Sequence, residues 1–219
     1  MSCKCCGCDG GQNKFHIFKA DEPIPCDAIV LFDGTDLSAW RKRSEDSPAE
    51  WKVENGYMEV VPRTGDIMTR EVFTDCQVHV EFWLPLMADK QGQARANSGV
   101  YLQGRYEVQV LDSYMLDPQT NDCAAFYRLA APRVNAARPP ETWQTYDIFF
   151  TAPRFNEEGV RISNARATVV WNGVFVHHDL EIPQPTGGEI DHEYHVPGPL
   201  MLQDHGNLIR FRNIWARKL

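Results

Sequence analysis

Short runs of apolar residues, many of them alternating with polar ones, recur along the chain and indicate β-strands. No apolar pattern keeps the helical period of 3.6 over ten residues, so we expect little helix, limited to a turn near residues 123–127. The predicted strands are "AIVLF" at 28–32, "YMEVV" at 57–61, "CQVHVEFWL" at 76–84, "YEVQVL" at 106–111, "TYDIFF" at 145–150, "ATVVW" at 167–171 and a closing alternation at 208–215.

Two dipeptides predict tight hairpins between these runs. Asn55-Gly56 and Asn172-Gly173 each separate two strand-like runs by two residues, which favours a type I′ turn. Many short antiparallel strands close into a barrel or stack as a sandwich. We expect an all-β fold, a two-sheet antiparallel jelly-roll sandwich. The connections at 114–142 and 183–199 are too long for turns, and long loops often serve function.

The chain opens with "MSCKCCGCDGG", in which Cys3, Cys5, Cys6 and Cys8 lie within six positions. Four thiolates suit zinc or copper(I), but the spacing lacks the paired knuckles of common zinc modules. We therefore interpret residues 1–27 as a cysteine-rich tail and lead-in, ahead of a single domain at 28–219. We expect such a tail on an exported, periplasmic or cell-surface protein, after loss of a signal and of a lipid anchor on cysteine. Cys26, Cys76 and Cys123 allow either one disulfide or three thiols.

Charge and hydropathy exclude two classes of partner. The 22 Lys and Arg against 30 Asp and Glu give a net charge of −8, and the only basic concentration is short, at residues 210–218. Nucleic acid is therefore not an expected partner. No apolar run reaches the ~20 residues that a helix needs to cross a bilayer, so we expect no membrane span.

The stretch "NSGVYLQGRYEVQVLDSY" at 97–114 holds the first candidate chemistry. A two-residue loop would set Leu102 opposite Glu107, whereas a three-residue loop around Gly104 would set Gln103 there and Tyr101 opposite Gln109. We expect the second register, because it collects polar side chains on one outward face. That face would carry Tyr101, Gln103, Glu107 and Gln109, while Tyr106, Val108 and Val110 point to the core. A solvated sheet face is the plainer alternative.

Asp112 adds a second carboxylate to this stretch. The spacing E-x-Q-x-x-D brings Glu107 and Asp112 near each other if a bulge turns the strand, and paired carboxylates commonly act at an anomeric carbon. The closing stretch "LQDHGNLIRFRNIWARKL" at 202–219 offers matching groups in Gln203, His205 and Arg212. The structural alternatives are a turn before the strand and an ion pair between Arg212 and Glu107.

Several motifs occur in order and together resemble the 3-keto-disaccharide hydrolase domain family over about residues 28–219. They are "LFDGTDLSAW" at 31–40, "WKVENGYMEV" at 51–60, "NSGVYLQGRYEVQVLD" at 97–112, the Trp143 strand, "WNG" at 171–173 and "GPLMLQDHGNLIRFRNI" at 198–214. Tyr127 matches the tyrosine of the family's "GAIY" region, whose glycine and isoleucine are replaced here. The resemblance implies a concanavalin-A-like jelly roll with a site on its concave face.

The resemblance also implies an enzyme that cleaves glycosides oxidised at C3. A C3 ketone acidifies the proton on C2, so a base can remove it, the enolate can expel the C1 aglycone, and water can add back. In this scheme Glu107, Asp112 and His205 handle protons, and Arg212 or a divalent metal stabilises the enolate; no other cofactor is expected. The expected substrate contacts are Tyr101, Gln103, Gln109, Tyr127 and Gln203.

Two other functions fit the same residues. A carbohydrate-binding, lectin-like module would keep the polar face and the tyrosines without turnover. A conventional retaining glycoside hydrolase would need the carboxyl groups of Glu107 and Asp112 about 5 to 5.5 Å apart. In all three cases the partner is a carbohydrate.

Overall fold

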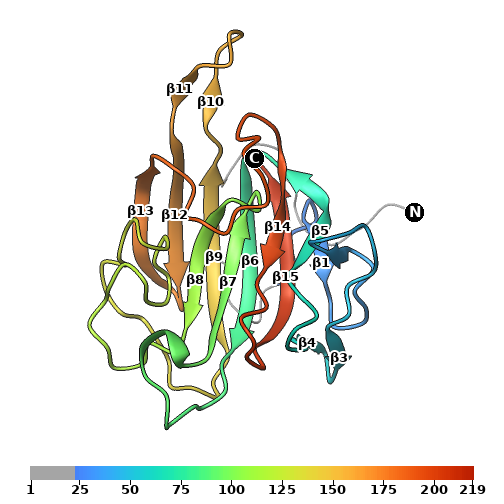
Figure 1. Ribbon diagram of the computed structural model, residues 1–219, viewed down its shortest axis with the longest axis vertical. Helices are drawn as coiled ribbons and strands as arrows, with labels where there is room; N and C mark the ends of the chain where they lie inside the picture. The colour runs from blue at the N-terminus through green and yellow to red at the C-terminus, as the bar shows by residue number, and fades with distance from the viewer. Residues whose placement is uncertain (1–22) are drawn as a thin grey trace.

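The computed structural model describes residues 23–219, and strands account for nearly all of its regular structure. The helical part of this range is one 3-10 turn, Gly92–Ala94, rather than the turn expected near 123–127. Two antiparallel sheets stack face to face, with β7, β8 and β14 crossing in front of β6, β9 and β15 in Figure 1. The predicted two-sheet antiparallel sandwich is thus confirmed.

Sheet A is the larger layer and has eight strands. β1 (Ile29–Phe32) pairs with β15, beside the main order of the sheet. That order is β13 (Val174–Ile182), β12 (Ala165–Trp171), β9 (Gln144–Thr151), β6 (Cys76–Trp83), β15 (Arg210–Lys218), β4 (Tyr57–Glu59) and β3 (Lys52–Glu54).

Sheet B has five strands and faces the viewer in Figure 1. A separate two-stranded hairpin, β10 (Arg154–Phe155) and β11 (Arg161–Ser163), projects beyond the sandwich. The order of sheet B is β2 (Trp40–Lys42), β5 (Ile67–Phe73), β14 (Gly198–Leu202), β7 (Asn97–Leu102) and β8 (Tyr106–Leu111).

Both predicted Asn-Gly hairpins are present. Asn55 and Gly56 have φ angles of 49° and 79° between β3 and β4, and Asn172 and Gly173 have 52° and 82° between β12 and β13. Positive φ at both central residues defines the type I′ turn, which asparagine and glycine tolerate best. The turns match the right-handed twist of their strands and so fix the two registers.

The core lies between the sheets and is filled by alternate residues of each strand. Tyr106, Val108 and Val110 of β8 point into it, as predicted, so their neighbours face outward. The predicted register of β7 and β8 is wrong by two residues. Tyr101 lies opposite Glu107 and Gly99 opposite Gln109, because the three-residue loop begins at Gln103, which takes φ 52° ahead of Gly104 at 64°.

The cysteine predictions divide between described and undescribed residues. Cys3, Cys5, Cys6 and Cys8 lie outside the described residues. Cys76 and Cys123 are buried free thiols, and burial raises the pKa of each to about 12. Cys26 is exposed, and the structure contains no disulfide between it and the other two. Within residues 23–219, no helix is long and apolar enough to cross a membrane.

Candidate active site

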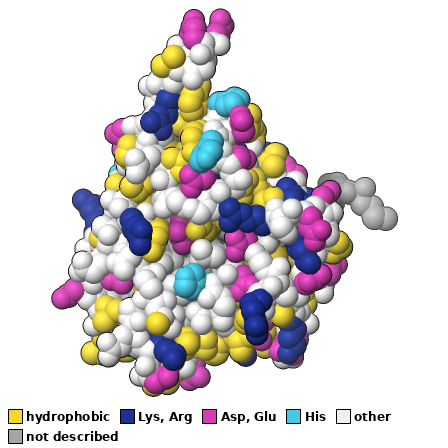
Figure 2. Space-filling model, in the orientation of Figure 1, with side chains coloured by type: hydrophobic (Ala, Val, Ile, Leu, Met, Phe, Trp, Pro, Cys, Tyr) yellow, Lys and Arg dark blue, Asp and Glu magenta, His cyan; other side chains and the backbone are white. Residues whose placement is uncertain are grey.

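A hollow of about 310 Å³ lies on the outer face of sheet B, near the middle of the surface that Figure 2 shows. Strands β7 and β8 and the residues just after β14 form its floor and rim, and the two long connections form its walls. We call it the Glu107 pocket. It is lined by Gln93, Asn97, Tyr101, Glu107, Gln109, Tyr127, Arg128, Thr186, Gly187, Gly188, Gln203 and His205.

Glu107 is the buried acid of this pocket, with only 4 % of its surface exposed. Burial raises the pKa of its carboxyl to about 7; a hydrogen bond from the Tyr101 phenol opposes this rise and the charge of Asp66 adds to it. Burial also raises the pKa of Tyr101 far above its usual value, so the phenol stays protonated and donates. A carboxylate that titrates near neutrality suits a general base.

The floor leaves room for this carboxyl because residue 99 is glycine. A Cβ at Gly99 would lie 2.5 Å from Oε1 of Glu107 and 2.9 Å from Cε2 of Tyr101. The backbone of Glu107 is held as well, since its amide donates to Oγ1 of Thr186 at 2.7 Å. The position of Glu107 is therefore fixed by the β7/β8 pairing, by the space that Gly99 leaves and by the Thr186 hydroxyl.

Three amide side chains lie beside Glu107 and are linked to one another. Nδ2 of Asn97 donates to the backbone and side-chain oxygens of Gln93 at 3.1 and 3.2 Å, and Nε2 of Gln109 donates to Oε1 of Gln93 at 3.1 Å. Asn97 is only 1 % exposed, yet its Oδ1 has no hydrogen-bond partner among the described residues. A buried acceptor without a donor is costly, so the protein leaves the polar groups on this side of the pocket incompletely satisfied.

One wall of the pocket comes from the connection between β8 and β9. This segment runs along β8, with Gln109 and Ala125 joined by a backbone hydrogen bond and the amide of Tyr127 donating to the carbonyl of Glu107. The pairing places the Tyr127 ring and the Arg128 cation at the mouth, with the guanidinium 5.2 Å from the ring centre. The wall thus adds an aromatic face and a positive charge.

The other wall is the loop between β13 and β14, and a buried arginine anchors it. Arg105 donates through Nε and Nη2 to the two carboxylate oxygens of Asp191, at 2.7 and 3.1 Å, and through Nη1 to the carbonyl of Val196. Gly188 of this loop approaches the sheet closely, since a Cβ there would lie 2.9 Å from the Tyr101 hydroxyl. The anchor therefore sets the depth of the pocket.

The structure brings six of the nine predicted site residues together. His205 lies at the exposed rim and Gln203 lies on the floor, where its Nε2 donates to the Tyr101 hydroxyl at 3.3 Å. The six are Tyr101, Glu107, Gln109, Tyr127, Gln203 and His205. All six therefore line one pocket.

Three predicted site residues lie elsewhere. Gln103 sits in the β7/β8 turn and donates to the carbonyl of Phe73, so it does not face the pocket. Asp112 follows the end of β8 and accepts from the amide of Tyr114, with Arg95 3.8 Å from its carboxylate. No bulge turns it toward Glu107, because β8 pairs regularly with β7 over its whole length.

Arg212 lies on the opposite side of the sandwich. Its strand, β15, belongs to sheet A, and Nε donates to Oε2 of Glu81 at 2.6 Å while the guanidinium stacks 4.1 Å from the Trp143 ring centre. The expectation that the closing strand directs Arg212 toward the same site as Glu107 is therefore wrong, as is an ion pair between these two residues.

Glu81 belongs to a buried polar cluster on sheet A, and the partly exposed Arg212 binds it from the outer side. Burial alone would raise the pKa of Glu81, but hydrogen bonds from His79, Asn213 and Arg212 outweigh it and lower the value to about 2. Burial alone would lower the pKa of His79, but Asp147, 2.8 Å from Nδ1, and Glu81 raise it to about 9. The charges satisfy one another, which is typical of a structural network.

Sequence reasoning missed several groups of the pocket. Asn97 was inside the quoted motif, but its position at the first residue of a strand gave no sign that its oxygen would be left without a donor. Arg128 replaces Arg212 as the cation of the pocket, and no pattern marked it. The glycine pair at 187–188 was the available signal for the loop.

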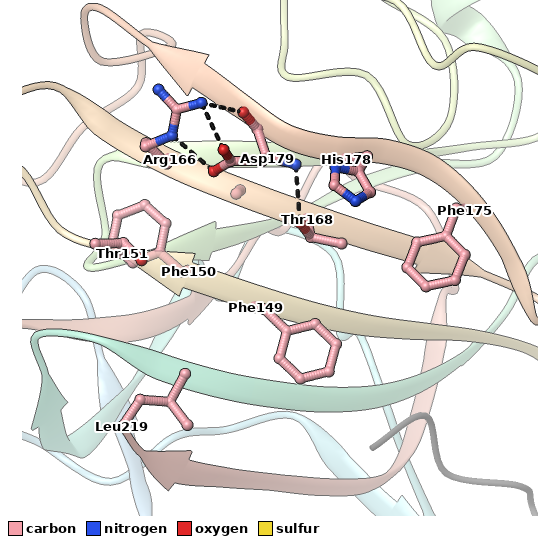
Figure 3. A pocket seen from close by; sticks show the side chains of 10 residues that line it. Phe149, Phe150, Thr151, Arg166, Thr168, Phe175, His178, Asp179 and Leu219 are labelled. Atoms are coloured by element: carbon pink, nitrogen blue, oxygen red, sulfur yellow. Dashed lines mark hydrogen bonds and ion pairs between the residues drawn. The ribbon is translucent and has the colours of Figure 1, made fainter. Parts of the chain in front are cut away.

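A more apolar hollow lies on the outer face of sheet A, lined by side chains of β9, β12 and β13 (Figure 3). Its main charges are already paired, since Nε of Arg166 donates to Oδ1 of Asp179 at 2.6 Å. His178 lies beside this pair, and Phe175 lies beyond His178. No buried acid lines it, so the Glu107 pocket is the better candidate for chemistry. Across residues 23–219, no three His, Cys, Asp or Glu side chains cluster as metal ligands would.

Comparisons with known proteins agree with this fold. A family profile described as "3-keto-alpha-glucoside-1,2-lyase-like domain" matches residues 27–217. A crystal structure of a candidate glycosyl hydrolase from Parabacteroides distasonis ATCC 8503 is 37 % identical, with a TM-score of 0.82 over 94 % of this chain and 95 % of that chain.

More distant structures share the fold alone. A second candidate glycosyl hydrolase from the same organism is 17 % identical, with a TM-score of 0.65 over 88 % of this chain and 94 % of that one. Alginate lyase Aly36B is 9 % identical, with a TM-score of 0.50 over 88 % of this chain and 97 % of that one. The comparison with curated proteins returned no match. The profile spans nearly the whole described sandwich, and the chain therefore belongs to the 3-keto-alpha-glucoside-1,2-lyase-like domain family.

Proposed function

We propose that this protein cleaves glycosides whose sugar carries a ketone at C3, and that Glu107 is the base. The observation that carries the proposal is a buried carboxyl with a pKa of about 7 on the floor of a polar, sugar-sized pocket. At neutral pH a substantial fraction is ionised and can accept the C2 proton, which the adjacent ketone has acidified.

The proposed reaction proceeds by elimination and hydration. Glu107 takes the proton from C2, the electron pair of the C–H bond forms the enolate, and the C1–O bond breaks as the enolate collapses. The aglycone oxygen takes a proton from His205 at the pocket rim or from water. Water then adds across C1 and C2, and the product is the free 3-keto sugar.

The enolate needs donors or a positive charge beside its oxygen. With Arg212 on the far sheet, Arg128 is the cation available at the mouth, and the amides of Gln109 and Gln203 are the neutral donors. Preorganised donors of this kind are typically worth ~10² to 10³ in rate. The Tyr127 ring would lie against the face of the sugar.

The alternative functions receive less support from the geometry. A retaining glycoside hydrolase needs a second carboxylate across the anomeric carbon, and Asp112 lies outside the pocket, next to Arg95. A lectin-like module accounts for the polar face. It does not account for a carboxyl, that of Glu107, whose pKa burial raises to about 7.

The test is incubation with a 3-keto-glucoside that bears a chromogenic aglycone, followed from pH 5 to 9. We expect release of the aglycone by the wild type and none by Glu107→Gln, while the unoxidised glucoside stays intact. Calorimetry with the unoxidised glucoside distinguishes the lectin-like alternative: tight binding without release from the 3-keto substrate would refute the proposed activity.

A further inference from the structure

A second pocket lies beside the Glu107 pocket on the same face of sheet B, and we call it the flanking pocket. Its volume is about 530 Å³. One apolar cluster, made of Met68, Tyr101, Met201 and Ile190, lies between the residues that line the two pockets. Tyr101 also lines the Glu107 pocket, whereas Met68 and Ile190 line the flanking pocket. A ligand that extends past Tyr101 and Ile190 would occupy both pockets at once.

The two pockets also share a wall and an electrostatic environment. The loop that places Thr186 and Gly188 at the Glu107 pocket continues to Ile190 and Asp191 at the flanking pocket. The charge of Asp66, which lines the flanking pocket, contributes to the raised pKa of Glu107. The flanking pocket is therefore next to the Glu107 carboxyl, within reach of a substituent on a sugar bound there.

The carboxylates of the flanking pocket are already bound within the protein. Asp66 accepts from Nη1 of Arg43 at 2.9 Å and from the amide of Asp204 at 2.9 Å. Asp191 is held by two nitrogens of Arg105. The nearby Asp204 carboxylate accepts from the amides of Gly65 and Gly206.

Arg41 differs from every other charged group of this lining. Strand β2 buries Trp40 in the core and so turns Arg41 to the outer face, opposite Met68 of β5. The only side-chain hydrogen bond of Arg41 within the described chain goes from Nη1 to the carbonyl of Lys42, at 3.4 Å. No carboxylate of that part lies within ion-pair distance of its guanidinium. The guanidinium is half-buried and lines the pocket, so it is available to an anion.

We propose that the flanking pocket binds a carboxylate on the aglycone of the substrate, with Arg41 as its ligand. The planar guanidinium matches a carboxylate with two parallel hydrogen bonds, and the Met68 and Ile190 side chains supply an apolar surface for the ring that bears it. Asp66 and Asp191 favour a singly charged carboxylate over a phosphate dianion, because they repel excess negative charge. This inference rests on the proposed cleavage and specifies its substrate class.

The experiment compares two 3-keto-glucosides, one with a 4-nitrophenyl and one with a 3-carboxy-4-nitrophenyl aglycone. The measured quantity is the ratio of kcat/KM for the carboxylated over the neutral substrate. We expect Arg41→Gln to lower this ratio roughly tenfold with little change for the neutral substrate, since a half-exposed charge-assisted contact is of that order. Added salt should lower the wild-type ratio in the same direction. Arg161→Gln, the same change on the projecting hairpin, should leave the ratio unaltered.

An unchanged ratio in Arg41→Gln would overturn the carboxylate site while leaving the proposed cleavage intact. If the wild type cleaves neither substrate, the proposed cleavage fails instead. In that case calorimetry with the unoxidised 3-carboxy-4-nitrophenyl glucoside decides on the site by itself. Weaker binding to Arg41→Gln than to Arg161→Gln supports the site, and equal binding overturns it.

Discussion

Tyr101 lies directly opposite Glu107 across the β7/β8 pair, and its phenol donates a hydrogen bond to the Glu107 carboxyl. The pair shares the floor of one pocket with a glycine behind it and a loop in front of it. This arrangement combines two opposing effects on one acid: burial disfavours the carboxylate, and the phenol favours it. The balance leaves the pKa of Glu107 near 7.

Glu107→Gln is expected to inactivate the protein and to stabilise it at alkaline pH. The pKa of Glu107 rises from 4.5 to about 7 on folding, so the native state binds more protons than the unfolded state between these values. Stability is therefore highest below pH 4.5 and falls as pH rises toward 7. Removing the charge should add about 1 to 3 kcal/mol to the free energy of unfolding at pH 8 and little at pH 4.

Urea unfolding at the two pH values measures this difference. Glu157→Gln, at the tip of the projecting hairpin, is the matched control and should change stability at neither pH. Equal stability of Glu107→Gln and wild type at pH 8 would show that burial does not destabilise the ionised form of Glu107.

Tyr101→Phe should shift the pH dependence of turnover rather than abolish it. The phenol lowers the pKa of Glu107, so its loss raises that pKa and moves the ascending limb of kcat/KM to higher pH. For the wild type we expect this limb near pH 7. The pH–rate profile with the 3-keto substrate measures both, and Tyr114→Phe, on an exposed residue, serves as the control. If the ascending limb of kcat/KM stays at the same pH in Tyr101→Phe, then Tyr101 does not control the pKa of the base.

Much of the fold could be predicted from local patterns. The two Asn-Gly turns, the alternation of Tyr106, Val108 and Val110, and the outward Glu107 all follow from backbone geometry that short segments impose on themselves. The exact register of β7 and β8 could not be predicted, because it depends on Gln103 adopting positive φ, which its side chain does not favour.

Strand alternation predicted the candidate site only where it lies on one strand or its neighbour, and Tyr127 was identified only through the family resemblance. Glu107 and Gln109 share a face because they are two residues apart. The prediction placed Arg212 in the wrong sheet. Alternation shows which face of a strand a residue lies on, but it does not show to which of the two sheets the strand belongs. Arg128 and Thr186 reach the pocket through long loops, whose paths depend on anchors such as Arg105 and Asp191 that no periodic pattern reveals.

Gly99→Ala should impair catalysis far more than stability. The added Cβ would lie 2.5 Å from Oε1 of Glu107 and 2.9 Å from Cε2 of Tyr101, so the carboxyl end of Glu107 and the edge of the Tyr101 ring must both shift. A displacement of the base by about 1 Å can reduce the rate roughly 10²-fold. We expect kcat/KM to fall by about that factor while the thermal melting curve stays close to that of the wild type. Wild-type kcat/KM in this variant would mean that the base is not held against residue 99.

Asp191→Asn should loosen the loop over the pocket. Burial alone would raise the pKa of Asp191, but the hydrogen bonds from Arg105 and from the Glu193 amide, together with the Arg105 charge, outweigh burial and lower the pKa below its usual value of 3.8. The stability from this pair is therefore present above pH 3.8 and lost as pH falls below it. Because Asp191 is 37 % exposed, solvent screening limits the loss in Asp191→Asn to about 1 kcal/mol. We expect a higher KM for the neutral 3-keto substrate with a smaller change in kcat, measured by steady-state kinetics; an unchanged KM would contradict an anchoring role.

Arg212→Lys and Arg128→Lys form a matched pair that tests which face of the sandwich is active. Arg212 binds Glu81, a buried carboxylate, and stacks on Trp143, and lysine offers neither the planar fork nor the stacking surface. We expect Arg212→Lys to lower the free energy of unfolding by about 1 to 2 kcal/mol and to leave kcat unchanged. Arg128→Lys should do the reverse, with unaltered stability and a kcat reduced by ~10² if its guanidinium stabilises the enolate. Urea unfolding and single-substrate kinetics on both variants give the answer, and a large loss of kcat in Arg212→Lys alone would move the active site to sheet A.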